Sequence, residues 1–171
     1  AHGGGGPETP GIRVQVNPVS GDPSDDISVP LLERGVRAVL AREEIPEAEI
    51  SVTLLDDSGI EDLNRLYLDR PHPTDVIAFP LFESDEPVVG DVYVGVDQAR
   101  RQAAELDLLL DEELLRLAIH GTLHVLGYDH PEDGDRESSR MYRLQEELVD
   151  RLMTDFRGPD STGPGSSEGG P

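Results

Sequence analysis

The chain has 171 residues, which suits one domain better than two. It has no cysteine, which excludes a disulfide framework, a thiolate metal site and a cysteine nucleophile, and it has no apolar run long enough to span a membrane. Its 36 acidic residues face 14 basic residues, all of them arginine, and the formal net charge of −22 is opposite in sign to that of ordinary nucleic-acid-binding proteins.

Both ends of the chain have compositions that are typical of disorder. Residues 1–11 read AHGGGGPETPG, and residues 158–171 read GPDSTGPGSSEGGP. Segments so rich in Gly, Pro and Ser cannot bury enough apolar surface to offset the entropy lost on ordering. We therefore expect a disordered head over 1–11, a single domain over 12–157 and a disordered tail over 158–171.

The first predicted elements are a strand and a helix. Apolar and polar residues alternate over 12–16, as in a half-buried strand. Ser28 is a suitable N-cap, and Pro30 suits the first turn of the helix that follows. The apolar stripe of that helix is predicted to be Leu32, Val36, Val39 and Leu40.

The middle of the chain contains three further predicted strands. A strand over 50–55 precedes a short helix over about 57–67. The next strand covers 75–79, and Pro80 directly after it indicates that the strand ends there or lies at the edge of a sheet. A fourth strand is predicted over 90–96.

The last part of the domain is predicted to be helical. Asp97 is expected to cap a helix over 98–106, and Asp111 to cap another over 112–126. A final helix covers 135–156. The order β-α-β-α-β-β-α-α-α indicates an α+β fold, in which a small four-stranded mixed sheet is packed with about five helices.

Three of the five histidines fall within eleven positions, at His120, His124 and His130. Side chains at i and i+4 of a helix share one face, so His120 and His124 can aim at one point. Gly127 predicts a helix end with a left-handed residue, after which the chain can return His130 to the same point. Three imidazoles with one open position form the ligand set of a catalytic zinc, so the spacing predicts a catalytic metal site.

The same histidine spacing occurs in H-E-x-x-H-x-x-G-x-x-H zinc proteases. Those enzymes need the Glu after the first His as a general base. Here that position is Gly121, and Asp129 directly precedes the third histidine, where its position relative to the metal differs. Peptide hydrolysis is therefore disfavoured, although a zinc-dependent peptidase remains an alternative.

Two segments resemble one family. HGTLHVLGYDH, residues 120–130, resembles the H-G-x-L-H-L-x-G-Y-D-H signature of the YbeY family, with Val125 as its one departure. PTDVIAFP, residues 73–80, resembles the family's P-T-D-V-L-S-F-P segment, and residues 90–94 resemble its G-D-I-x-I strand. The resemblance covers about residues 50–150.

The resemblance implies a single-strand-specific, metal-dependent endoribonuclease that acts in 16S rRNA 3′-end maturation and ribosome quality control. It also implies a four-stranded sheet packed with helices, on which the helix carrying the histidines is similar to the active-site helix of zinc metalloproteases. By position the metal ligands are His120, His124 and His130, holding one zinc ion per chain or another divalent metal. The expected partners are single-stranded rRNA and the small ribosomal subunit, with no membrane, in the cytoplasm.

The mechanism stays open at two points. The nucleophile is either a water held by the metal on the three histidines or a ribose 2′-OH, with the metal acting as a Lewis acid. Asp129 either orients a ligand imidazole or makes an Asx contact at the turn. A non-catalytic ribosome-assembly factor with a structural metal is a further alternative.

The sequence offers several candidates for contacts with RNA. Many family members carry an arginine where this chain has Leu68, and Arg70 either replaces it or is a solvent-exposed charge. Tyr128 either stacks on a base or packs beside the turn. Asp75 and Asp91 either line the cleft or are ordinary acidic residues of the strands.

The acidic body constrains how RNA is bound. Because the chain cannot attract RNA over its whole surface, binding must depend on the metal and a few arginines. Arg70, Arg100 and Arg101 are the candidates, although pairing with neighbouring acids is favoured for any one of them. Few phosphate contacts predict that binding depends weakly on salt. The acidic, lysine-free composition is also compatible with adaptation to a salty cytoplasm.

Overall fold

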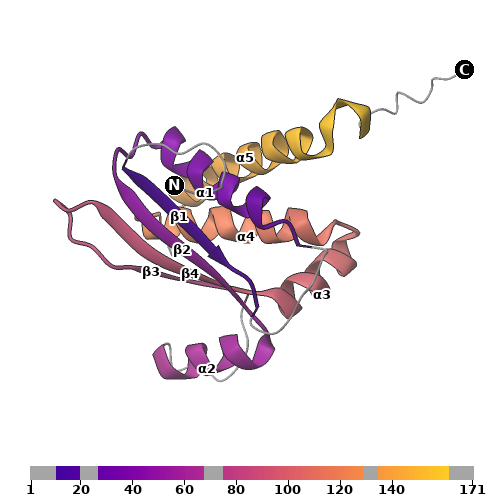
Figure 1. Ribbon diagram of the computed structural model, residues 1–171, viewed down its shortest axis with the longest axis horizontal. Helices are drawn as coiled ribbons and strands as arrows, with labels where there is room; N and C mark the ends of the chain where they lie inside the picture. Colours follow the sequence, from indigo (N-terminus) through magenta and orange to yellow (C-terminus); the bar gives the residue numbers. More distant parts are fainter. Residues whose placement is uncertain (1–10, 20–26, 68–74, 129–134, 162–171) are drawn as a thin grey trace, which may run out of the picture.

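The computed structural model describes residues 11–19, 27–67, 75–128 and 135–161 (Figure 1). Four strands and five helices follow one another in the predicted order within these ranges. They are β1 (Ile12–Asn17), α1 (Val29–Arg42), β2 (Ala48–Leu55), α2 (Asp57–Tyr67), β3 (Val76–Pro80), β4 (Val88–Gly95), α3 (Val96–Leu106), α4 (Leu110–Val125) and α5 (Asp135–Ser161).

The strands form one mixed sheet in the order β1-β2-β4-β3, which confirms the predicted fold class. β1, β2 and β4 are parallel, and β3 pairs with β4 in the antiparallel direction. β3 is therefore an edge strand, as Pro80 at its end predicted, since proline cannot donate to a further strand.

The helices divide between the two faces of the sheet. α1, α4 and α5 lie over one face, and α2 lies on the other side (Figure 1). α4 packs directly against β3 and β4 and also contacts α1, α3 and α5. This central position explains why α4 buries most of its residues.

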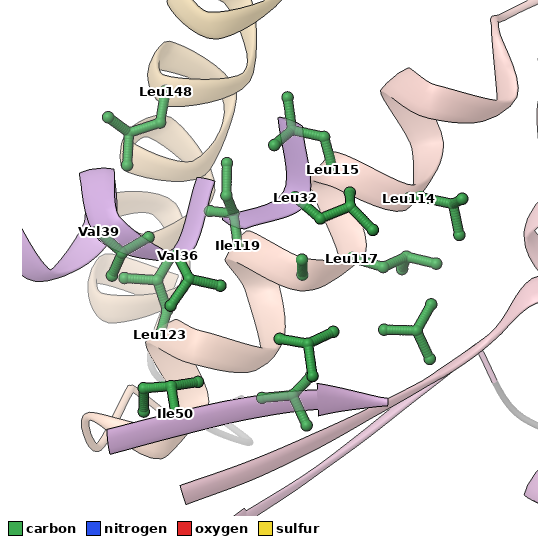
Figure 2. Close-up of a cluster of buried hydrophobic side chains, with 14 of the residues drawn as sticks. Leu32, Val36, Val39, Ile50, Leu114, Leu115, Leu117, Ile119, Leu123 and Leu148 are labelled. Atoms are coloured by element: carbon green, nitrogen blue, oxygen red, sulfur yellow. The ribbon is translucent and has the colours of Figure 1, made fainter. Parts of the chain in front are cut away.

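The core lies between α4, α1 and the sheet (Figure 2). The predicted stripe of α1 is fully buried there, since its members are at most 1% exposed. Each such Val or Leu contributes about 1.5–3 kcal/mol through the area it removes from water. The labelled side chains that meet in this cluster include Leu32, Val36, Ile50, Leu115, Ile119, Leu123 and Leu148.

The N-terminus of α1 forms as predicted. Ser28 is the N-cap, and its Oγ accepts a hydrogen bond from the backbone N–H of Leu31 at 3.3 Å. Pro30 lies in the first turn, where its missing N–H has no helical partner to lose.

Two other predicted caps are wrong. The N-cap positions of α3 and α4 are occupied by Gly95 and Leu109, and neither residue makes a side-chain hydrogen bond to its helix. Asp97 instead accepts the backbone N–H of Asp57 at the start of α2, at 2.9 Å, and Asp111 accepts the N–H of Ser28, at 2.7 Å. Each carboxylate accepts a hydrogen bond at the start of a helix that is distant in sequence, because tertiary packing brings that backbone N–H close to it.

The C-terminal helix begins at Asp135, as predicted, and its assigned range extends to Ser161. Helical geometry is interrupted at Gly158, which has φ 79° and ψ 164°, so the break falls where the tail was predicted to start. Residues 162–171 of the predicted tail and residues 1–10 of the predicted head lie outside the described residues. None of the helices in the described ranges combines the length and apolarity that crossing a membrane requires.

Candidate metal centre

His120 and His124 lie one turn apart near the C-terminal end of α4. Both side chains are partly buried, on a stripe of the helix that the core does not use. Their rings are in contact, with centroids 4.5 Å apart and planes inclined at 79°. The predicted i, i+4 pairing is therefore present, and the two imidazoles meet rather than diverge.

The two rings meet through the same kind of nitrogen. Nε2 of His124 lies 3.0 Å from Nε2 of His120. Two nitrogens that each bind one zinc ion at about 2.0–2.1 Å lie no more than about 4 Å apart. The observed separation therefore fits two ligands of a single ion.

The other ring nitrogens face oxygen atoms. Nδ1 of His120 lies 2.8 Å from Oε1 of Gln145, and Nδ1 of His124 lies within hydrogen-bonding distance of the backbone carbonyl of Tyr128. A carbonyl oxygen only accepts, so each Nδ1 carries the proton and donates it. In the neutral imidazoles, both Nε2 lone pairs then point toward the shared space between the rings.

This arrangement favours a cation between the rings. Two lone pairs that face each other at 3.0 Å repel, and a bound proton or a metal ion relieves that repulsion. Metal-binding histidines characteristically donate the other ring N–H to a carbonyl or carboxylate, as both histidines do here. The donor set described so far therefore fits a divalent metal with imidazole ligands.

The turn after α4 supplies the carbonyl that holds His124. Gly127 has φ 109°, in the left-handed region that favours glycine, and confirms the predicted helix stop. The backbone N–H of Tyr128 then donates to the carbonyl of Leu123 at 3.1 Å. Closing the turn in this way brings the carbonyl of Tyr128 onto the ring of His124.

The position after the first histidine faces away from this centre. A Cβ added at Gly121 would lie 2.5 Å from Cγ1 of Val92 on β4 and 3.2 Å from Cγ2 of Val76 on β3. A glutamate here, as in the zinc proteases, would point into the sheet. The geometry of α4 thus argues against the peptidase alternative more strongly than the residue type alone.

Several predicted site residues cannot be placed. His130, Asp129, Arg70 and Leu68 lie outside the described residues. Within the described ranges, no group of three or more His, Cys, Asp or Glu side chains is arranged to hold a metal ion. The complete ligand set therefore stays a prediction, of which two members are seen to converge.

Tyr128 and Arg101, two predicted RNA contacts, have structural partners. Tyr128 packs against the core, and its hydroxyl donates to Glu43 at 3.1 Å. Arg101 makes a two-pronged ion pair with Asp57, with both N–O distances at 3.1 Å. These contacts agree with the alternative interpretation of each residue, as a packed aromatic and as a surface pair.

Asp91 lies on the face of the sheet away from α4. Side chains alternate along a strand, and its neighbours Gly90 and Val92 both face α4. Asp91 therefore does not line the centre formed by the histidines. On the opposite face it lies near Tyr93, whose pKa is raised by burial and then by the Asp91 carboxylate.

Gln145 was not identified from the sequence, although it contacts His120 directly. It is 7% exposed and lies on α5, 25 positions away in the chain. One signal was available in α4 itself, where Glu112, Arg116, His120 and His124 recur at intervals of four and so form one polar stripe. On α5, by contrast, no sequence pattern distinguishes Gln145 as the residue that contacts this stripe.

Comparisons with known proteins agree on one family. The family model YbeY, described as Endoribonuclease YbeY, matches residues 23–153. A relative from Persephonella marina, named Endoribonuclease YbeY, is 38% identical over 148 residues, which cover 84% of this chain and 95% of that protein. A second relative of the same name, from Desulfitobacterium hafniense, is 46% identical over 130 residues, which cover 70% of this chain and 81% of that protein. The solution structure of TM1509 from Thermotoga maritima matches with a TM-score of 0.62 at 30% identity, over 89% of this chain and 95% of that one.

Proposed function

The chain belongs to the endoribonuclease YbeY family, and from this premise we propose that it is a metal-dependent endoribonuclease specific for single strands. Its substrate is rRNA, and its role is maturation of the 3′ end of 16S rRNA together with ribosome quality control. The observation that carries the proposal is the pair of Nε2 atoms at 3.0 Å, each on a ring whose Nδ1 donates to an oxygen.

The metal ligands in this proposal are His120, His124 and His130, and zinc is the expected ion. When bound, a divalent metal supplies positive charge that lowers the pKa of a water molecule and stabilises charge on a phosphoryl oxygen. The protein supplies the position and the tautomer of the ligand rings. α4 sets the spacing of the first two imidazoles, and Gln145 and the Tyr128 carbonyl fix which nitrogen of each ring is available.

RNA binding in this proposal is local. The body of the protein is acidic, so a strand is attracted mainly where the metal and nearby arginines offset that charge. Arg70 is the arginine that we propose takes the place of the family residue at Leu68. The expected setting is the cytoplasm, with the small ribosomal subunit as partner.

Substitution of His124 tests the metal ligand and the reaction together. We expect His124→Ala to lose most bound zinc and at least about 100-fold of its cleavage of single-stranded RNA, since the metal supplies the reacting charge. Metal content is measured by mass spectrometry, cleavage on a labelled oligonucleotide, and folding by circular dichroism. The matched control is Glu105→Ala, at an exposed position on α3, which should keep both properties.

Three outcomes separate the alternatives. A folded His124→Ala protein that keeps its zinc and its cleavage contradicts the proposal. Loss of zinc together with most helical signal supports the assembly-factor alternative, in which the metal is structural. Cleavage of a peptide but not of RNA by the wild-type protein would restore the peptidase alternative.

A further inference from the structure

We propose that Gln145, Glu146 and Arg116 form a positioning network that fixes His120 in the tautomer presenting its Nε2 lone pair to the metal. The inference rests on the proposed metal site, and it adds Glu146 and Arg116, which that proposal does not use, behind the contact between Gln145 and His120. It is carried by an unbroken series of hydrogen bonds that runs from α4 to α5 and back to α4.

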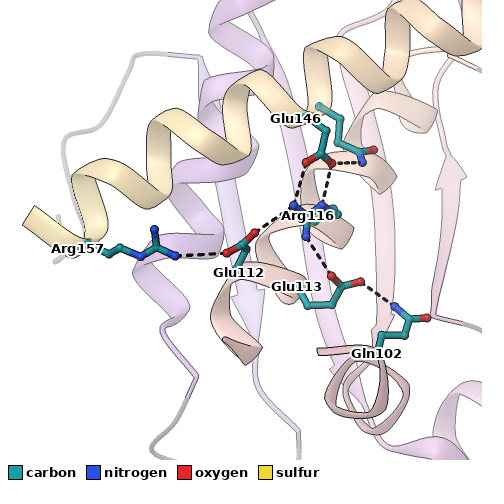
Figure 3. Close-up of polar contacts among 7 residues, drawn as sticks. Gln102, Glu112, Glu113, Arg116, Glu146 and Arg157 are labelled. Atoms are coloured by element: carbon teal, nitrogen blue, oxygen red, sulfur yellow. Dashed lines mark hydrogen bonds and ion pairs between the residues drawn. The ribbon is translucent and has the colours of Figure 1, made fainter. Parts of the chain in front are cut away.

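The network begins at a charge that cannot be neutralised. Arg116 lies one helical turn before His120, and a guanidinium only donates hydrogen bonds. Its Nε and Nη2 atoms donate to the two carboxylate oxygens of Glu146, at 2.8 and 2.9 Å (Figure 3). Arg116 also pairs with Glu112 and Glu113 on its own helix, at 3.2 and 3.1 Å. It is therefore held on three sides.

Glu146 stays ionised under this influence. The Arg116 guanidinium lowers the pKa of the Glu146 carboxyl below its ordinary value, against the opposing effect of burial. An ionised carboxylate only accepts hydrogen bonds. Its neighbour Gln145 must therefore turn its amide NH₂ toward it, and Nε2 of Gln145 does lie 3.0 Å from Oε2 of Glu146.

The amide of Gln145 passes this orientation on to the histidine. With its NH₂ committed to Glu146, Gln145 presents only its carbonyl oxygen, Oε1, to Nδ1 of His120 at 2.8 Å. His120 must then carry its proton on Nδ1. The polarity set by Arg116 thus leaves the Nε2 lone pair of His120 free of a proton in the neutral ring, which a metal ligand requires.

His124 offers an internal reference. Its Nδ1 faces the backbone carbonyl of Tyr128, which no side-chain substitution removes. A change confined to the network should alter His120 and leave His124 as it is. A general loss of structure would alter both rings.

The first measurement is the tautomer of each histidine in the metal-free protein. It uses ¹⁵N-histidine labelling and long-range ¹H–¹⁵N NMR at about pH 8, above the ordinary imidazole pKa of about 6.5. We expect the Nδ1–H form for both rings in the wild-type protein. The Gln145→Met substitution keeps the length of the side chain and removes the oxygen that accepts from His120. In this variant we expect His120 alone to become a mixture of the Nδ1–H and Nε2–H tautomers.

A second variant reverses the polarity instead of removing it. In Glu146→Gln, the new amide can accept from Arg116 and donate to Oε1 of Gln145, so Gln145 can offer its NH₂ to His120. We expect the Nε2–H form of His120 to increase in this variant. The matched control for Gln145→Met is Gln98→Met, which makes the same change on α3, where Gln98 contacts Gln102 and Arg101.

Zinc affinity is the second readout, measured by competition with a chelating dye. Loss of an outer hydrogen-bond partner typically costs 10–100-fold in metal affinity, and we expect Gln145→Met to bind zinc more weakly by about that factor. An Nε2–H form of His120 in the wild-type protein overturns the inference. So does a Gln145→Met protein with unchanged tautomer and zinc affinity. Absence of zinc binding by the wild-type protein contradicts the proposed function, whereas the tautomers decide on the network.

Discussion

Gly121 serves packing, although it directly follows His120 in the histidine motif. It lies between His120 and the rest of the site motif, yet its Cα faces the sheet. Because α4 packs so closely on β4, the space that a Cβ needs is already taken by Val92. The glycine in the motif is thus explained by the approach of helix to strand rather than by the reaction.

Replacement of Gly121 by alanine should destabilise the protein. The added methyl group overlaps Val92 in a well-packed core, which costs about 1–3 kcal/mol, more than the gain in helix propensity. Urea unfolding followed by circular dichroism measures the change. Val92→Ala supplies the control, since it leaves a cavity when made alone and makes room when combined with Gly121→Ala.

The double variant decides whether this contact is responsible. We expect the two costs to be less than additive by about 1 kcal/mol or more, as for residues in direct contact. Additive costs would show that the strain at Gly121 arises elsewhere.

Among individual residues, the sequence predicted the histidines but not their supports. His120 and His124 are recognisable because the spacing of both lies within one helix. Gln145 is recognisable only once α5 is packed against α4, because a glutamine on an amphipathic helix has many possible partners. Local periodicity identifies the pair of histidines, whereas tertiary packing selects the residue behind His120.

Helix termini illustrate the same limit for whole elements. Ser28 caps its own helix as predicted, because the cap and the N–H that it satisfies are three residues apart. Asp97 and Asp111 also accept hydrogen bonds from the N-terminal regions of helices, but those helices are α2 and α1. The residue type indicated the interaction correctly, and only the fold determined which terminus receives it.

Asp97 should therefore stabilise α2 rather than α3. We expect Asp97→Ala to cost about 1 kcal/mol, within the range of about 0.5–2 kcal/mol for a lost cap acceptor. Asp97→Asn is the matched control, because its amide oxygen can still accept from the Asp57 N–H. Amide hydrogen exchange resolves the location, with faster exchange in the first turn of α2 expected for the alanine variant.

The competing result is equally specific. Faster exchange confined to the first turn of α3, with α2 unchanged, would return Asp97 to its predicted role as the cap of its own helix. Such a result would contradict the hydrogen bond to Asp57.

For the molecule as a whole, the net charge is strongly negative, and several arginines of the described ranges pair with carboxylates. Within the described ranges, Arg42 pairs with Glu147 at 2.9 Å, Arg65 with Asp62 at 3.2 Å, and Arg101 with Asp57. Exposed pairs of this kind contribute little to stability. They do, however, reduce the positive charge available for phosphates, so the surface is poorly suited to hold RNA at many points.

Binding of single-stranded RNA should consequently depend weakly on salt. Each phosphate contact adds about 0.7 to the slope of log K against log salt, so three contacts predict a slope of about −2. Fluorescence anisotropy with a labelled oligonucleotide, from low to molar salt, measures it. A slope steeper than about −4 would require six or more contacts and would contradict a local binding site.

The fold class of the whole molecule was predictable from the hydrophobic periods and the order of its elements. Strands and helices alternate with clear periods, and the order of elements permits few arrangements of a small sheet. The strand order β1-β2-β4-β3 and the antiparallel edge were not predicted, apart from Pro80 marking β3. Pairing between strands depends on packing that no local pattern encodes.

The proposed requirement for RNA cleavage is a metal held by His120, His124 and His130. It is tested most directly by removing metal from the purified wild-type protein with a chelator and returning zinc in measured amounts, while following RNA cleavage and circular dichroism. We predict that cleavage is lost on chelation, that helical signal is retained, and that activity returns in proportion to zinc until one ion per chain is bound. Undiminished cleavage by protein shown to be free of metal would contradict this requirement.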